Sequence, residues 1–124
     1  MNNLNKDLKT GLEKMLAHMV NDYAGWNTLC INRTVRTPEM VSRRDEMIKE
    51  YETGLHYTVG SKYIKIINGK SGGVEGFIVN TETDKKFRFG DILKPAGWAT
   101  PARNFARGNV IDGTLERVKW TGAC

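Results

Sequence analysis

The segment KPAGWATPARNFARGNVID, residues 94–112, places aromatic rings, guanidinium groups and an amide close together. A ring such as that of Trp98 or Phe105 offers a face on which a nucleobase stacks. Arginines hold phosphate oxygens two at a time, and an asparagine amide reads an adenine edge or a ribose hydroxyl. Within this short stretch, the side chains that supply all three needs are Trp98, Arg103, Phe105, Arg107 and Asn109. The pattern therefore favours a site for a phosphorylated ligand that carries a base.

A structural interpretation of the same residues stays open. Trp98 and Phe105 would then plug the open end of a sheet, and the two arginines would pair with nearby acids. The acids within reach along the chain are Asp91, Asp112 and Glu116. A plug needs no arginines beside it, so the binding interpretation is favoured for the group as a whole.

The net charge of +5 is distributed unevenly along the chain. Residues 1–61 carry eight basic and eight acidic groups, whereas residues 62–124 carry eleven basic and six acidic groups. Six of the basic residues fall within 85–107, where Asp91 is the single acid. A basic cluster attracts phosphate-bearing partners, although charge runs also occur as solvated faces.

The sequence shows little that is typical of an enzyme. His18 and His56 lie far apart, and neither has a metal ligand at a useful spacing. No Ser or Cys lies in a nucleophile elbow. The stretch GKSGG, residues 69–73, lacks the first glycine of a phosphate loop and predicts a hairpin turn. We therefore expect a protein that is not an enzyme, with no cofactor and no metal site.

Length and composition predict one domain over residues 1–124, mainly helical in 1–56 and mainly β in 57–124. No apolar run is long enough to span a membrane, and no leader precedes the first expected helix. Cys30 and Cys124 lie far apart without a CxxC motif, which argues against a disulfide. We expect no membrane association and a cytoplasmic location.

Two helices are expected in the first half. Apolar residues recur at three- and four-residue spacing over 4–24, which predicts an amphipathic helix that ends before Gly25. The stretch TLCINRTV, residues 28–35, favours a strand or an extended connector. Thr-Pro-Glu at 37–39 is a helix start, and the helix that it opens ends near Gly54, a residue suited to a left-handed cap.

The second half predicts strands. YTVGSKYIKIIN (57–68), VEGFIVN (74–80) and KKFRFGDIL (85–93) carry β-branched or alternating residues between turn signals, which indicates an antiparallel meander. LERVKWTG, residues 115–122, fits a closing edge strand. The expected fold is α+β, with two N-terminal helices packed on a small antiparallel, curled β-sheet and a basic aromatic loop at 94–112.

The order YIKI, VEGFIVN, GDILKPAGW and PARNFARGN resembles a family of short tailed-bacteriophage proteins. Its common pattern is a Lys-Tyr-Ile-Lys-Ile strand, a strand with a central Phe, Gly-Asp-Ile-Tyr/Leu-Lys-Pro-Ala-Ser-Trp, and Ala-Pro-Ala-Lys followed by Arg-Gly-Asn. The resemblance covers residues 62–112 and is most specific at their C-terminal end. Gly97 stands where that family usually has Ser, and Arg103 stands where it usually has Lys. Many members carry no assigned function, so this resemblance implies a phage origin without a mechanism.

A second resemblance implies a mechanism. The helix-then-sheet order and the C-terminal pattern of rings and arginines are similar to the first family of phage Thoeris anti-defence proteins. Those proteins bind the cyclic ADP-ribose isomers that bacteria make as immune signals, without cleaving them, and some form dimers or hexamers and hold cyclic oligonucleotides. By this resemblance Phe77 or Trp98 stacks the base, Arg103 and Arg107 hold phosphates, and Asn109 reads the ribose or the base edge. With neighbouring residues included, the expected ligand-binding set is Phe77, Phe89, Lys94, Trp98, Arg103, Phe105, Arg107 and Asn109.

These features predict a phage protein that sequesters a small cyclic nucleotide, a cyclic ADP-ribose isomer or a cyclic oligonucleotide, in the cytoplasm of the infected bacterial host. Two alternatives stay open: a module that binds single-stranded nucleic acid, and an inhibitor directed at a protein of the host defence. The broad apolar stripe of residues 4–24 predicts a homo-oligomer, at least a dimer, with this helix at the interface.

Overall fold

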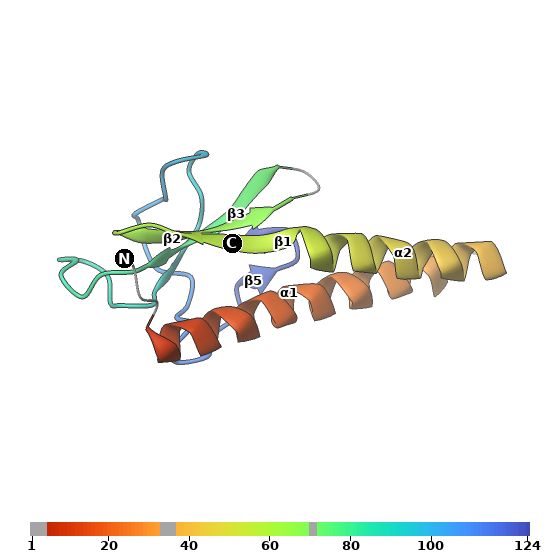
Figure 1. Cartoon of the computed structure of the whole chain (residues 1–124), viewed down its shortest axis with the longest axis horizontal. Helices are drawn as coiled ribbons and strands as arrows, with labels where there is room; N and C mark the ends of the chain where they lie inside the picture. Colours follow the sequence, from red (N-terminus) through yellow and green to blue (C-terminus); the bar gives the residue numbers. More distant parts are fainter. Residues whose placement is uncertain (1–4, 33–36, 70–71) are drawn as a thin grey trace.

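The computed structural model describes residues 5–32, 37–69 and 72–124 and has an α+β fold, as the sequence predicts. Two helices precede a four-stranded antiparallel sheet whose strands follow one another in space as they do in the chain. A separate two-stranded hairpin follows the sheet. Figure 1 shows α1 beneath a modestly curled sheet, and α2 nearly in line with β1. The elements are α1 (Lys6–Asn32), α2 (Pro38–Gly54), β1 (Leu55–Val59), β2 (Tyr63–Asn68), β3 (Gly73–Val79), β4 (Ile92–Leu93), β5 (Val118–Lys119) and β6 (Gly122–Ala123).

Helix α1 continues past the end that the sequence predicted. It runs through Gly25 to Asn32, so the predicted helix end at this glycine is wrong. The strand or connector predicted for 28–35 is wrong as far as residue 32, and positions 33–36 lie outside the described residues. A glycine inside a helix costs only about 1 kcal/mol relative to alanine, which tertiary packing readily offsets.

An aromatic cluster on both sides of Gly25 provides that packing. The ring of Tyr23 stacks on Tyr51 with centroids 4.5 Å apart. The ring of Trp26 lies 4.8 Å from that of Trp120. Aromatic pairs of this kind contribute about 0.5–1.5 kcal/mol each beyond the area that they bury. The helix is therefore stabilised beyond the glycine by contacts that are distant in sequence.

Helix α2 begins as predicted. The side chain of Thr37 accepts the backbone N–H of Met40 at 3.2 Å, and Pro38 occupies the first turn, where its missing N–H costs nothing. The helix also ends at Gly54 as predicted, but without a left-handed cap. Gly54 has no positive φ, and the chain passes directly from the helix into an extended Leu55 at the start of β1.

Strand β2 separates two faces of the sheet by simple alternation. Ile64 and Ile66 are fully buried on the face that packs against α1. Tyr63, Lys65 and Ile67 point to the opposite face and are half-buried. The opposite face therefore carries the ring of Tyr63 and the charge of Lys65.

Of the strand predicted for 85–93, the structure has only Ile92 and Leu93 as a strand, β4, so the prediction is wrong for residues 85–91. The residues before β4 form turns, because the carboxylates of Asp84 and Asp91 accept three backbone N–H groups at 2.8–3.0 Å. Such local bonds compete with the hydrogen-bond ladder of a sheet. Phe87 and Phe89 consequently pack into different clusters and do not share one strand face.

The main core lies between α1, the last turn of α2, the sheet and the C-terminal hairpin. Leu8, Leu12, Met15 and Met19 of the α1 stripe are fully buried within the single chain. The premise for an oligomer interface on residues 4–24, that the sheet leaves this stripe uncovered, is therefore wrong for these side chains. Oligomerisation stays a prediction from the sequence.

The C-terminal hairpin does not extend the main sheet, so the closing edge strand predicted for 115–122 is wrong. Strands β5 and β6 pair with each other, and side chains of the two helices hold the turn between them. The Tyr51 hydroxyl donates to the carbonyl of Trp120 at 2.8 Å, and the Asp22 carboxylate accepts the N–H of the same residue at 2.9 Å. These bonds fix the hairpin against α1 and α2.

Candidate functional site

The face of the sheet turned away from α1 carries a small core formed by Phe77, Val79, Phe87 and Leu93. All four side chains are at most 6% exposed. The segment after β4 crosses this face and returns beside β4, where Arg107 N–H donates to the carbonyl of Ile92 at 2.7 Å. The crossing segment therefore brings its basic residues over the polar face of β2.

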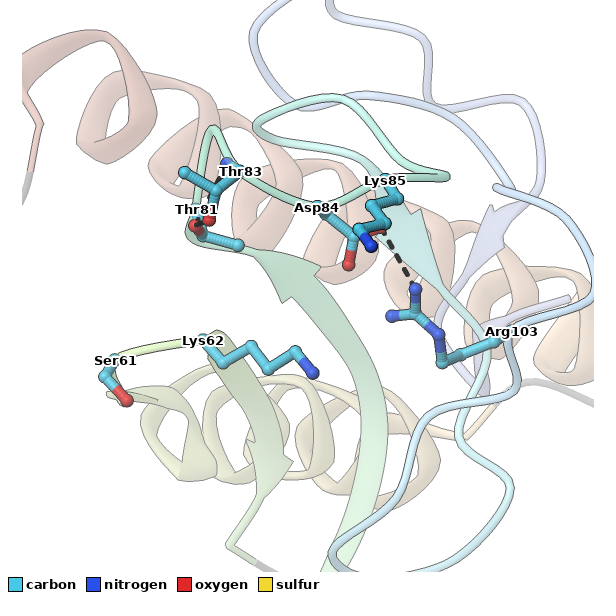
Figure 2. A pocket seen from close by; sticks show the side chains of 7 residues that line it. All are labelled: Ser61, Lys62, Thr81, Thr83, Asp84, Lys85 and Arg103. Carbon is cyan, nitrogen blue, oxygen red and sulfur yellow. Dashed lines mark hydrogen bonds and ion pairs between the residues drawn. The ribbon is translucent and has the colours of Figure 1, made fainter.

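An open pocket of about 440 Å³ lies where the β1–β2 turn meets the segment that follows β3. Figure 2 shows Lys62 and Arg103 extending into the same open space from different segments. Three cations against one carboxylate make the pocket positive, and hydroxyl groups add neutral donors and acceptors. A positive pocket with hydroxyl donors favours the binding of phosphate groups. The lining residues are Ser61, Lys62, Thr81, Thr83, Asp84, Lys85 and Arg103.

Arg103 is oriented by two hydrogen bonds. One terminal nitrogen donates to the Tyr63 hydroxyl, and the other donates to Asp84 at 3.0 Å. The guanidinium carbon also lies 4.9 Å from the centre of the Phe87 ring. A guanidinium has five N–H donors in a planar fork, and 40% of this side chain is exposed. Arg103 is therefore held in place and still has donors for a ligand.

Asp84 fixes this arrangement. Its Oδ1 accepts the Arg103 guanidinium and the backbone N–H groups of Lys86 and Phe87, at 2.9–3.0 Å. The hydrogen bond from Arg103, followed by the two backbone bonds, holds the pKa of Asp84 well below its ordinary value. The same hydrogen bond raises the pKa of Arg103. Both groups therefore stay charged at neutral pH, and the guanidinium keeps its orientation.

Trp98 offers an exposed ring outside the pocket lining. It is 58% exposed, and the Lys65 ammonium lies 4.5 Å from the ring centre. Lys65 and Tyr63 lie on one face of β2, about 7 Å apart along the strand. Through Lys65, the indole therefore contacts the strand whose Tyr63 orients Arg103.

Phe77 and Phe89 do not offer a face to a ligand. Phe77 is 2% exposed within the small core, so the expectation that it stacks a base is wrong. Phe89 is half-buried against the main core. Among the rings expected to stack a base, Trp98 is the exposed ring that contacts β2, through Lys65.

Asn109 supports the loop and does not face a ligand. It is 3% exposed, and its Nδ2 donates to the Phe89 carbonyl and to Asp91 at 3.0 and 2.9 Å. Its Oδ1 accepts the N–H groups of Ile111 and Asp112 at 2.8 and 3.1 Å. Because the amide is used up by these bonds, the expectation that Asn109 reads a ribose or a base edge is wrong.

Three further predicted residues lie outside the pocket lining. Lys94 is exposed, and Phe105 is 44% exposed. Arg107 is 6% exposed and donates to Asn104 Oδ1 and the Phe105 carbonyl, both at 2.7 Å. The expectation that Arg107 joins Arg103 in one phosphate site is therefore wrong for this pocket.

The sequence did not single out three residues that matter here. Lys62 and Asp84 line the pocket, and Tyr63 orients Arg103 from outside the lining. Lys62 and Tyr63 lie far from the 94–112 segment in sequence. Alternation in YIKI indicates that Tyr63 points away from the buried isoleucines, but the strand order is needed to bring it to Arg103.

The histidines hold structural positions. His18 Nε2 and His56 Nδ1 each lie 2.8 Å from a backbone carbonyl oxygen. Within residues 5–32, 37–69 and 72–124, no group of three or more His, Cys, Asp or Glu residues could hold a metal ion. In the same part of the chain, no helix has the length and apolarity needed to cross a membrane.

Comparisons with models of protein families, with curated proteins and with solved structures give no match for this chain.

Proposed function

We propose that this protein binds a nucleotide-derived ligand through the Arg103 pocket and the neighbouring Trp98 ring. The observation that carries the proposal is the convergence of Arg103, Lys62 and Lys85 on one open pocket, with an exposed indole in contact with Lys65 of β2, the strand whose Tyr63 orients Arg103. The guanidinium and the two ammonium groups would hold phosphate oxygens, and the indole would stack the base.

Lys65 and the pocket hydroxyls complete this binding mode. The Lys65 ammonium over the Trp98 ring adds a further positive charge at the stacking position. Thr81 and Thr83, whose hydroxyl oxygens lie 2.8 Å apart, line the opposite part of the pocket and can bond ribose hydroxyls. The ligand would thus meet cations at its phosphates and neutral groups at its sugar.

The resemblance to phage anti-defence proteins suggests which ligand this protein binds and where. The ligand would be a cyclic ADP-ribose isomer or a cyclic oligonucleotide, held without cleavage in the cytoplasm of the infected bacterial host. A protein that acts in this way must bind the signal tightly, and it needs no catalytic residues. Removal of the free signal would silence the immune enzyme that senses it.

Mass spectrometry of the small molecules released by heat tests this proposal. The protein is purified from bacteria that make cyclic ADP-ribose signals, as the parent chain and as Arg103→Ala. A nucleotide released by the parent and lost from the variant supports the proposal. A parent protein that releases no nucleotide from such cells argues against sequestration.

A single-stranded nucleic-acid-binding module is the second candidate. The observation that favours it is the open character of the surface, where exposed Trp98 and Phe105 each have a cation over the ring. Successive bases of a strand stack on such rings. A strand that contacts several phosphates loses roughly a thousandfold or more in affinity between low and moderate salt. A small nucleotide held in one pocket depends far less on salt, so titrations at two salt concentrations separate the candidates.

A further inference from the structure

A second cationic position surrounds Phe105, outside the Arg103 pocket. The Phe105 ring is 44% exposed. The guanidinium carbon of Arg107 lies 3.8 Å from its centre, and that of Arg117 lies 5.3 Å from the same point. One exposed ring therefore contacts two guanidinium groups, and neither group contacts a carboxylate among the described residues.

The surroundings of Arg107 are unusual for a buried charge. It is 6% exposed, and its hydrogen bonds go to the neutral oxygens of Asn104 and Phe105. Its Nε is buried without a hydrogen-bond partner among the described residues. The neighbouring arginines differ, since Arg103 pairs with Asp84 and Arg88 with Asp112. Buried charges are normally paired, so Arg107 lacks the anion that its position calls for.

Arg117 is placed to share such an anion. Its side chain is exposed, and its carbonyl accepts the backbone N–H of Cys124 at 2.9 Å, which ties its backbone to the C-terminal hairpin. No ion pair between Arg117 and a carboxylate occurs among the described residues. Two guanidinium forks beside one ring offer several N–H donors to a tetrahedral oxyanion.

We infer that Arg107 and Arg117, positioned by Phe105, form a second site that binds a phosphate group. This site goes beyond the proposed function, because neither arginine lines the Arg103 pocket. A bound phosphate would neutralise the two like charges. The phosphate could belong to a free nucleotide or to a nucleic-acid strand, which share this chemistry.

Isothermal titration with inorganic pyrophosphate tests the inference, because this probe has no base to stack on Trp98. The parent should bind at two sites per chain. Arg117→Ala should lose one of them, with affinity there reduced about ten- to a hundredfold, and Arg103→Ala should lose the other. Arg117 is chosen because its side chain is exposed, so the fold should survive. Arg43→Ala, in an exposed ion pair on α2, is the control and should bind like the parent.

An unchanged titration in Arg117→Ala overturns the second site, whatever Arg103→Ala does. Loss in Arg117→Ala with no effect in Arg103→Ala supports the second site and removes the pocket proposal instead. Further titrations with ADP and with a short oligothymidylate identify the source of the phosphate. The source is the ligand whose affinity falls in Arg117→Ala.

Discussion

At the residue scale, arginines that are similar in sequence have different roles because their partners differ. Arg88 bonds Asp112 at 2.8 Å on the surface, and such exposed pairs contribute little to stability. Arg103 is fixed by Asp84 yet keeps exposed donors, which suits it to phosphate. Arg107 is buried between neutral oxygens. The three arginines differ in how deeply they are buried and in whether a carboxylate pairs with them. Neither property can be deduced from the residue type.

Asn109→Ala should destabilise the fold, because it removes the donor to the buried Asp91 carboxylate and the half-buried Phe89 carbonyl, and the acceptor of two backbone N–H groups. Leaving such groups unpaired costs about 1–3 kcal/mol each, so we expect a loss of at least about 2 kcal/mol in the free energy of unfolding, measured in urea. Asn21→Ala, on the exposed face of α1, is the matched control. Equal stabilities of the two variants would contradict the structural role of Asn109.

Glu75 makes stability depend on pH. Burial raises its pKa from 4.5 to about 7. Between these two values the folded chain keeps a proton that the unfolded chain releases. The contribution of Glu75 is therefore present in full below the lower value, falls as pH rises through the higher one, and stays lost above it.

Glu75→Gln removes this titration, so the free energy of unfolding of the variant minus that of the parent should rise with pH. We expect a rise of at most about 3 kcal/mol between pH 4 and pH 8, followed by urea denaturation. Other acids cancel in this difference. A difference that does not change with pH would show that Glu75 is ionised normally in the folded chain.

At the element scale, α1 shows that local sequence signals alone do not determine where a helix ends. Gly25 ends the helix in a sequence-based prediction, yet α1 passes through it because of the rings that pack beyond it. Gly11 has the opposite situation, since it packs directly on the backbone of Val110. One glycine is incidental to the helix, and the other permits a close contact.

Gly25→Ala should stabilise the protein by about 0.5–1 kcal/mol, because nothing lies within 4 Å of an added methyl group. Gly11→Ala should destabilise it, because the methyl would overlap the carbonyl oxygen of Val110. Thermal unfolding followed by circular dichroism measures both. If Gly25→Ala lowers the melting temperature, α1 does not continue through residue 25 as described.

The sequence predicted those elements whose signals are local. The cap at Thr37 and the β-branched runs of β2 and β3 are such signals, and both were confirmed. The strand over 85–93 was not predicted correctly, because Asp84 and Asp91 bind backbone N–H groups that a propensity argument leaves to the ladder. In the site, the composition of residues 94–112 predicted Trp98 and Arg103. It could not predict their partners on β2, Lys65 and Tyr63, which only the folded chain brings near.

At the scale of the whole molecule, the helices extend past the sheet as an arm, as Figure 1 shows. The stripe of α1 is covered by the sheet and the C-terminal hairpin, whereas Tyr51 is the one described side chain of α2 that is buried. Met47 and Ile48 of α2 pack against the main core and are half-buried, so each leaves part of its apolar side chain exposed.

A homo-oligomer remains the prediction from the sequence. Light scattering coupled to size exclusion at micromolar concentration should give at least twice the chain mass of 14.0 kDa. Any interface should include α2, so Ile48→Lys should shift the protein toward the monomer, while Lys49→Ala, its exposed neighbour, should not. A mass of one chain for the parent would remove the oligomer.

The central claim is that the Arg103 pocket holds the phosphate of a nucleotide, and isothermal titration with cyclic ADP-ribose tests it most directly. The parent, Arg103→Ala and the control Arg43→Ala are compared at low and moderate salt, with melting temperatures measured alongside. Arg103→Ala should stay folded, because Asp84 keeps its two backbone N–H donors, and should bind about ten- to a hundredfold more weakly. Arg43→Ala should bind like the parent. If Arg103→Ala is folded and binds as tightly as the parent, the pocket is not the nucleotide site.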